Sequence, residues 1–241
     1  MIIQNIIFDK AIDKRNKEVL NLLLDNADEN CIQNGQKRLL MRRIQYCFEN
    51  DVDLWKKVLD VLKPDVNRYS RKNTALANLL ESTYTKFIYE RVKILIDYGA
   101  KVNKVDGSLT KLPALQHYLM FHSTYDDRII DLLLANGADI NAVNYQGNNY
   151  LMCQIDRRYQ YYGYVEEVDI NETRRIINKY DLDITLPNKK GLTLLDFIEK
   201  ASIDIKEDLK DKHVYNKERL EKRVDNLNEL KTFYLSLTGG I

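Results

Sequence analysis

Two ten-residue stretches of this chain share one pattern of apolar and polar positions. Ile94–Asn103 and Leu132–Asn141 each hold an apolar triplet, then Gly-Ala two residues later, then an apolar residue and Asn. They begin at residues 94 and 132, 38 residues apart. Apolar side chains at helical spacing predict amphipathic helices over 91–98 and 126–135. Self-similarity at a period of roughly 20–50 residues is typical of stacked repeats, in which each helix buries its apolar face on a neighbouring unit.

The Asn that ends each stretch marks the ends of further units. Val61–Asn67 ends in the same way, and Ile176–Thr185 places Thr185 in the Asn position. A second landmark, the start of a Leu-rich helix, recurs at 72–80, 112–119, 147–155 and 191–198. We therefore predict two helices per unit, with units near 1–30, 31–67, 68–103, 104–141, 142–185 and 186–200. Gly99 and Gly137 are expected to end second helices, because glycine adopts a positive φ without a Cβ clash.

These landmarks resemble the ankyrin repeat. In that family the first helix begins Gly-x-Thr-Pro-Leu-His-x-Ala and the second ends Leu-Leu-x-x-Gly-Ala-Asp-x-Asn. The second half is well matched at Leu132–Asn141, whereas no unit holds the full Thr-Pro-Leu-His, and Thr74-Ala-Leu-Ala and Thr193-Leu-Leu-Asp come nearest. The resemblance implies an all-α, ankyrin-type helical solenoid of about five to six repeats with short turn fingers. It covers residues 6–198 and implies binding through an extended surface.

The C-terminal part departs from the repeat. We divide the chain into a repeat stack at 1–198 and a charged segment with a terminal helix at 199–241. Over 217–237, Leu220, Val224, Leu227, Leu230 and Tyr234 form a single apolar stripe. We interpret this helix as a cap on the last repeat, since terminal units of such arrays are atypical. A helix that pairs with a partner is the alternative, although the stripe is short for a coiled coil.

Composition and charge limit the classes of function. The 241 residues carry 37 Lys and Arg against 36 Asp and Glu, so the near-neutral chain gives no electrostatic case for nucleic acid or an acidic membrane. Three cysteines without metal-ligand spacing favour a reducing, cytoplasmic setting, the cytoplasm of a host cell included. The apolar start is too short and too soon interrupted for a signal peptide. We expect a soluble monomer.

No motif points to catalysis, so we predict a non-enzyme without metal or cofactor. Cys153 has no neighbouring base, and no phosphate-binding glycine loop occurs. His117 and His122, with Asp126 and Asp127 nearby, are the one place where a metal-dependent enzyme could be drawn. We read His117 instead as lying near the position where ankyrin repeats carry a hydrogen-bonding His, shifted by one residue.

The departures from the period mark candidate binding residues. Insertions fall between the two helices of a unit at 81–89, 121–125 and 156–167, and such insertions map to loops on one face of a repeat array. The longest is rich in Arg and Tyr, types enriched at the energetic centres of interfaces. It contributes Arg157, Arg158, Tyr159, Tyr161, Tyr162 and Tyr164. The turns between units add Tyr69, Arg71, Asp106, Tyr145 and Lys189 on the expected concave face.

We therefore predict a protein-binding module, an adaptor or inhibitor that recognises another protein through the concave face, the finger turns and the 156–167 loop. Degenerate repeats with lengthened loops are similar to ankyrin proteins of viruses and intracellular bacteria, which implies a host or competitor protein as partner. The alternatives are the metal-dependent enzyme around 117–127 and a binder of single-stranded nucleic acid through stacking on the Arg/Tyr loop.

Overall fold

A computed structural model describes residues 2–32, 43, 47–48, 51–68, 74–82, 87–105, 111–156, 168–211 and 217–239. Within these ranges every regular element is an α-helix. The predicted all-α class is thereby confirmed. The chain divides into two compact units, Met1–Gly107 and Ser108–Ile241, and each is described separately.

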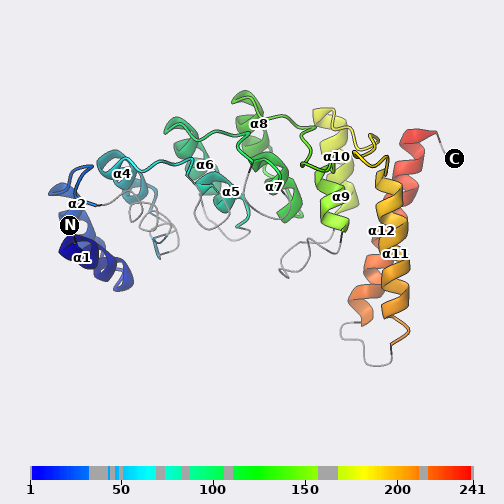
Figure 1. The fold of residues 1–241 in the computed structure, drawn as a ribbon, viewed down its shortest axis with the longest axis horizontal. Coiled ribbons are helices and arrows are strands. Elements are labelled where there is room, and N and C mark those ends of the chain that lie inside the picture. Colours follow the sequence, from blue (N-terminus) through cyan, green and yellow to red (C-terminus); the bar gives the residue numbers. More distant parts are fainter. Residues whose placement is uncertain are drawn as a thin grey trace. The chain divides into compact units, whose positions relative to one another are not determined.

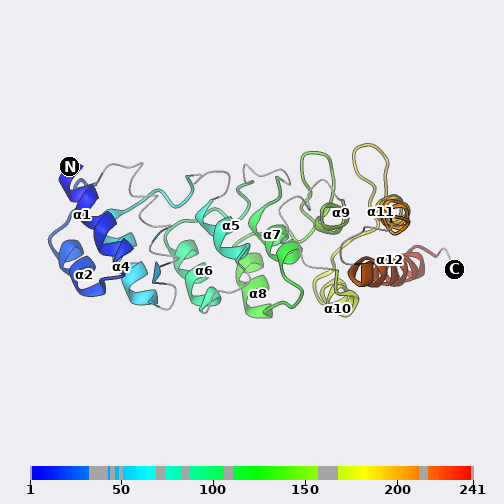
Figure 2. The ribbon, with the colours of Figure 1, turned by 90° about the horizontal axis from the view of Figure 1, so that it is seen from below.

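The first unit is built from short helices that pack in succession. Its helices are α1 (Ile2–Asp13), α2 (Lys17–Asp25), α4 (Val52–Leu62), α5 (Ala75–Leu80) and α6 (Ile88–Asp97). α1 packs on α2, α2 on α4, and α6 on both α4 and α5. Within this unit α1 and α5 lie on one side and α2, α4 and α6 on the other (Figures 1 and 2). The layers bury Trp55, Leu59 and Leu95 almost completely.

The second unit also has two layers of helices. It contains α7 (Ala114–Phe121), α8 (Asp127–Ala135), α9 (Tyr150–Ile155), α10 (Ile170–Tyr180), α11 (Leu194–Asp208) and α12 (Lys217–Thr238). Within this unit α7, α9 and α11 lie along one side and α8, α10 and α12 along the other (Figure 2). α9 packs on both α7 and α11. All residues of α9, and all of α7 except Phe121, are buried.

Helix starts follow from the polar residue that precedes each apolar run. Thr74 and Asn149 accept a hydrogen bond from the backbone N–H three residues on, at 3.2 and 2.9 Å. Asp169 caps α10 in the same manner, and Asp126 caps α8 by accepting from the N–H of Arg128, two residues on. These side-chain oxygens satisfy N–H groups that have no partner inside the helix. Thr, Asn and Asp caps therefore set the start of α5, α8, α9 and α10, whereas α6 and α7 begin after Phe87 and Pro113 without a side-chain cap.

The predicted glycine stops are confirmed at two helix ends. Gly99 has φ +84° and Gly137 has φ +83°. Beyond them, the N–H of Ala100 donates to the carbonyl of Leu95, and the N–H of Ala138 donates to that of Leu133, at 2.9 and 3.0 Å. This pairing closes the last helical turn in the way that requires a left-handed residue, which glycine supplies at least cost.

Two Asn side chains at the ends of predicted repeats each bond to a turn further along the same compact unit. Asn67 donates from Nδ2 to the carbonyl of Gly99 at 2.7 Å and accepts from the N–H of Lys101 at 2.7 Å. Asn141 makes the same pair of bonds to Asp181 and Asp183, at 3.2 and 2.7 Å. Each Asn thus bridges one turn to a later turn, which presents one carbonyl and one N–H at matching distance.

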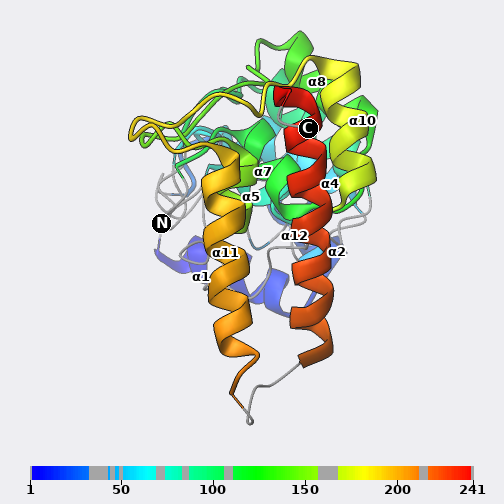
Figure 3. The same cartoon turned by 90° about the vertical axis from the view of Figure 1, so that its right-hand side faces the viewer.

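The C-terminal helices form an antiparallel pair, seen side by side in Figure 3. α11 continues through residue 198, the expected edge of the stack, to Asp208. α12 packs on α11 and α10 and buries Leu227, Leu230, Phe233 and Tyr234. Leu220 and Val224, from the first half of the predicted stripe, are half-buried. The stripe therefore faces the protein's own helices along the second half of α12.

Candidate functional site

A hydrogen-bonded turn precedes α9, and one Asn side chain organises it. Asn144 Oδ1 accepts hydrogen bonds from the N–H groups of Gln146 and Asn148, at 2.9 and 3.0 Å. The backbone N–H of Asn144 donates to the carbonyl of Asn148 at 2.9 Å, and that of Gly147 donates to the carbonyl of Asn144 at 2.8 Å. Asn144 is almost fully buried. The backbone of residues 144–148 is thus fixed from within.

A second turn of the same design precedes α11. Asn188 Oδ1 accepts from the N–H groups of Lys190 and Leu192, at 2.9 and 3.0 Å. Its N–H donates to the carbonyl of Leu192 at 2.8 Å, and the N–H of Gly191 donates to the carbonyl of Asn188 at 2.9 Å. Every bond that Asn144 makes within its turn therefore has a counterpart here, so the two turns adopt one conformation. In Figure 2 the loops before α9 and α11 extend past these helices, on the side away from α10 and α12.

The two turns are also bonded to each other. Asn188 Nδ2 donates to Oδ1 of Asn148 at 2.7 Å, and the backbone N–H of Lys189 donates to the carbonyl of Gln146 at 3.0 Å. Gly147 has φ +81°, and a Cβ placed on it would lie 2.8 Å from the backbone nitrogen of Lys189. The close approach of the turns thus depends on the missing side chain at residue 147.

Large apolar side chains stand exposed on these turns. Val143 is 46% exposed, Tyr145 56%, Leu186 59% and Leu192 40%. Lys189 and Lys190 are exposed beside them, and Lys111 Nζ lies 4.6 Å from the centroid of the Tyr145 ring. We call the set Val143, Tyr145, Leu186, Lys189, Lys190 and Leu192 the finger surface. Grouped exposed apolar side chains are a mark of interaction sites, whereas isolated ones are ordinary.

The structure brings two of the predicted site residues together. Tyr145 and Lys189 hold the equivalent place, directly after the organising Asn, in the two adjacent turns. The other predicted turn residues, Tyr69, Arg71 and Asp106, lie outside the described residues. The six loop residues Arg157, Arg158, Tyr159, Tyr161, Tyr162 and Tyr164 lie outside them as well.

Sequence reasoning missed most of the finger surface. Val143, Leu186 and Leu192 were not predicted as site residues, because apolar residues beside a helix start are usually assigned to the core. Their exposure follows from the turn conformation that Asn144 and Asn188 impose. The repeated spacing Asn-x-x-Gly, at 144–147 and 188–191, was the available indication that both turns have one geometry.

In the region 117–127, considered above for a metal-dependent enzyme, the two histidines pack against aromatic rings. His117 is buried and its ring stacks on Phe121, with centroids 5.7 Å apart, while the His122 ring lies 4.6 Å from that of Tyr118. Tyr118 Oη accepts from the N–H of Asp126 at 2.8 Å, and burial raises the pKa of Tyr118 to about 12. The 121–125 insertion thus folds back onto α7, since Tyr125 also donates to the carbonyl of Leu119 at 2.9 Å.

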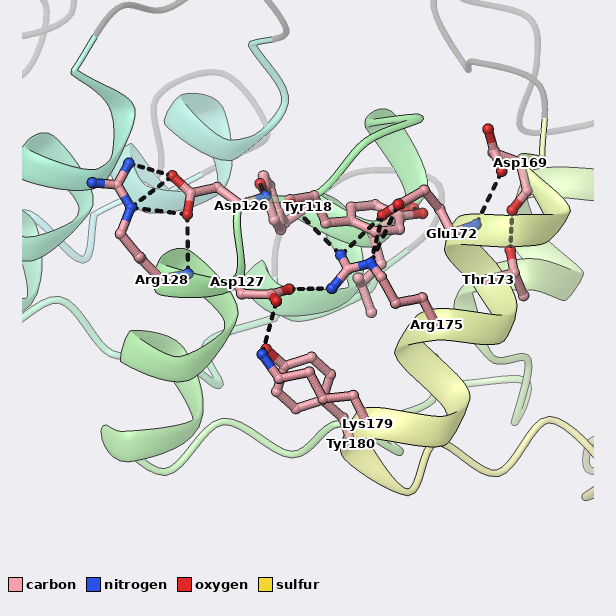
Figure 4. A network of polar contacts seen from close by, with 12 residues as sticks. Tyr118, Asp126, Asp127, Arg128, Asp169, Glu172, Thr173, Arg175, Lys179 and Tyr180 are labelled. Carbon is pink, nitrogen blue, oxygen red and sulfur yellow. Dashed lines mark hydrogen bonds and ion pairs between the residues drawn. The ribbon is translucent and has the colours of Figure 1, made fainter.

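The two carboxylates of this region face cations instead of the histidines. Figure 4 shows Asp127 between Arg175 and Lys179 of α10, at 2.6 and 2.8 Å. Hydrogen bonds from Lys179 and Arg175 lower the pKa of Asp127, and those from Arg128 lower the pKa of Asp126. Arg175 also pairs with Glu172 at 2.9 Å. This cluster joins α8 to α10.

Two further predicted positions have structural partners. Cys153 is buried and lies 3.4 Å from Nδ2 of Asn144, within the support of the finger turn. The hydrogen-bonding position expected near His117 is filled by its neighbour Gln116, whose Nε2 donates to the carbonyls of Asp139 and Ile140 at 2.7 and 3.0 Å. Asp139 and Ile140 lie in the turn that follows α8. The buried Gln116 therefore joins α7 to this turn.

No group of three or more metal-binding side chains is found within the described ranges. Among the same residues, none of the helices is both long and apolar enough to cross a membrane.

Fold and site together define an all-helical chain of paired helices whose connecting turns carry an exposed surface. No protein-family model matches the sequence. The chain is similar to a protein of Acanthamoeba polyphaga mimivirus described as a putative ankyrin repeat protein, with 36% identity over 75 residues. The similarity covers 29% of this chain and 12% of that protein, so the chain spans a small part of the length of this relative.

Proposed function

We propose that this chain is a non-catalytic, ankyrin-type protein-binding module. The repeated helix pairs, the Asn bridges between consecutive units and the similarity to the mimivirus protein support a solenoid of about five to six repeats. The packing of α12 on α10 and α11 supports a capping function for this helix. Degenerate repeats favour a viral or intracellular-bacterial factor that acts in the cytoplasm as an adaptor or inhibitor of another protein.

The finger surface is the observation on which this proposal rests. A partner that packs on Tyr145 and Leu186 removes large apolar areas from water, which is the main favourable term in protein association. The turns that carry them are fixed by internal hydrogen bonds before any partner binds. Little conformational entropy is then lost on association, and a preorganised surface gains affinity for that reason.

A comparative capture experiment tests the proposal. Immobilised wild-type protein is compared with Tyr145→Ala/Leu186→Ala in extracts of cells that express it, and captured proteins are quantified by mass spectrometry. The control is Ile203→Ala/Leu237→Ala, which removes side chains of α11 and α12 that are 59% and 43% exposed. We expect one or more proteins to be retained by the wild type and the control and lost with the turn variant. Equal retention by all three would contradict a partner site at the finger surface.

A further inference from the structure

We propose that the finger surface recognises a linear acidic segment of a partner that contains both Asp or Glu and large apolar residues. The proposal rests on the binding function proposed above and specifies the chemistry of the partner. Its first basis is the placement of charge. Between residues 140 and 148, and between 184 and 192, the chain carries Lys189 and Lys190 and neither Asp nor Glu.

Acidic residues next to the turns are engaged by their own backbone. Asp139 Oδ1 accepts from the N–H of Asn141 at 2.8 Å, and Asp183 Oδ1 accepts from the N–H of Thr185 at 2.8 Å. Asp196 Oδ2 accepts from the N–H of Thr193 at 2.7 Å, which fixes it at the start of α11. Lys189 and Lys190 make no ion pair with a described residue. The flanking carboxylates are thus directed to their own backbone, and the two ammonium groups are open to carboxylates from outside.

The apolar members of the finger surface define the rest of the partner. Val143, Leu186 and Leu192 offer aliphatic surface, and the Tyr145 ring adds an aromatic face. A segment of charged residues alone would leave these groups in water. One of mixed character buries them while its carboxylates meet the two lysines at the rim, the arrangement found in specific interfaces.

A protein segment fits this surface better than a nucleic acid does. Binding to a phosphate backbone draws its free energy from many cations that displace counterions, and two lysines supply little of it. The three aliphatic side chains also have no stacking function toward bases, in contrast to aromatic platforms. Apolar side chains of a peptide would cover them instead.

Selection from a displayed library of random short peptides tests the inference on the full chain. We expect the enriched peptides to combine Asp or Glu with Leu, Ile, Phe or Trp. The affinity of the most enriched peptide is then measured by fluorescence anisotropy. Lys189→Glu/Lys190→Glu should weaken it by about tenfold or more, and added salt should weaken it further. The matched control, Lys210→Glu/Lys222→Glu, makes the same charge change in the turn after α11 and on α12, and should leave affinity unchanged.

The outcomes distinguish failure of the acidic-segment proposal from failure of the finger surface as a binding site. Enriched peptides without acidic residues, no enrichment at all, or unchanged affinity with Lys189→Glu/Lys190→Glu would each overturn the acidic segment. If Tyr145→Ala/Leu186→Ala alone abolishes binding, the finger surface remains the site and only its charge preference is wrong. If neither variant alters binding, the proposed site fails as well. Tighter binding of a labelled single-stranded oligonucleotide than of the selected peptide would assign the surface to nucleic acid.

Discussion

The side-chain amide of Asn188 donates to the side-chain oxygen of Asn148 at 2.7 Å, although 40 residues separate them in the chain. Both side chains are almost fully buried. The bond connects the turn before α9 to the turn before α11, so each turn supports the other. A surface built on two such turns keeps its shape because its supports are internal.

Replacing Asn188 should destabilise the protein measurably. Asn188→Ala removes the bond to Asn148 and leaves the N–H groups of Lys190 and Leu192 without their acceptor. Loss of a buried hydrogen-bonding partner costs about 1–3 kcal/mol. Urea unfolding followed by circular dichroism gives the change in the free energy of unfolding. Asn228→Ala, at an exposed site on α12, is the control and should change it by about 0.5 kcal/mol or less. Equal effects of the two changes would contradict the assigned function of Asn188.

Gly147 and Gly191 form a matched pair that separates backbone strain from steric conflict. Both have positive φ, at +81° and +75°, so an alanine is strained at either site by about 1–2 kcal/mol. Only at Gly147 would the new Cβ meet another backbone atom, 2.8 Å away, whereas nothing lies within 4 Å of it at Gly191. Gly147→Ala should therefore be the more destabilising by about 1–3 kcal/mol, the usual cost of overpacking. Thermal denaturation of both variants checks the order, and a larger loss at Gly191 would refute it.

The cluster around Asp127 should make stability depend on pH in the acid range. Lys179 and Arg175 hold the pKa of Asp127 below its value of 3.8 in an unfolded chain, so the folded state binds this proton more weakly. The stabilisation is complete above the unfolded pKa and is lost as pH falls through the folded one. Asp127→Asn should lower stability at neutral pH and flatten its decline between about pH 5 and 2.

Unfolding free energies measured across that range test this dependence. Asp225→Asn, at an exposed site on α12, is the control and should keep the wild-type profile. If the free energy of unfolding of Asp127→Asn runs parallel to that of the wild type at every pH, Asp127 does not cause the pH dependence.

The contribution of α12 can be measured through Phe233. This side chain is 9% exposed, and the guanidinium of Arg174 from α10 lies 4.9 Å from its ring centroid. Phe233→Ala should cost about 3–5 kcal/mol, as expected for a large side chain removed from a packed core. Leu220→Ala, at a half-buried site on the same helix, should cost clearly less. Similar small losses for both would mean that α12 does not cover the last helices in solution.

Sequence periodicity predicted the helices well where apolar residues recur at helical spacing. α8 begins and ends within a residue or so of the range expected from Ile129–Leu134, and Gly137 ends it as anticipated. The exposed part of the finger surface could not be read from periodicity, since a turn has none. Asn188 fixes the turn that carries Leu192 by local bonds, and a further bond joins this turn to Asn148, 40 residues away, which no local pattern indicates.

Other parts of the candidate site depended on contacts that no local pattern encodes. Asp126 and Asp127 looked available to a metal beside His117, but cations from α10, some fifty residues on, engage Asp127. The six Arg and Tyr residues of 157–164, together with Tyr69, Arg71 and Asp106, remain predictions.

The Asn bridges between units have a consequence for how this chain can change. Asn67 reaches the carbonyl of a residue 32 positions ahead, and Asn141 makes the same bond across 40 positions. The same joint therefore closes whether the connection between two helices is short or long. A foreign segment grafted at that connection, or an insertion gained in evolution, would leave the Asn bond between the two turns in place. One scaffold can therefore present many different loops.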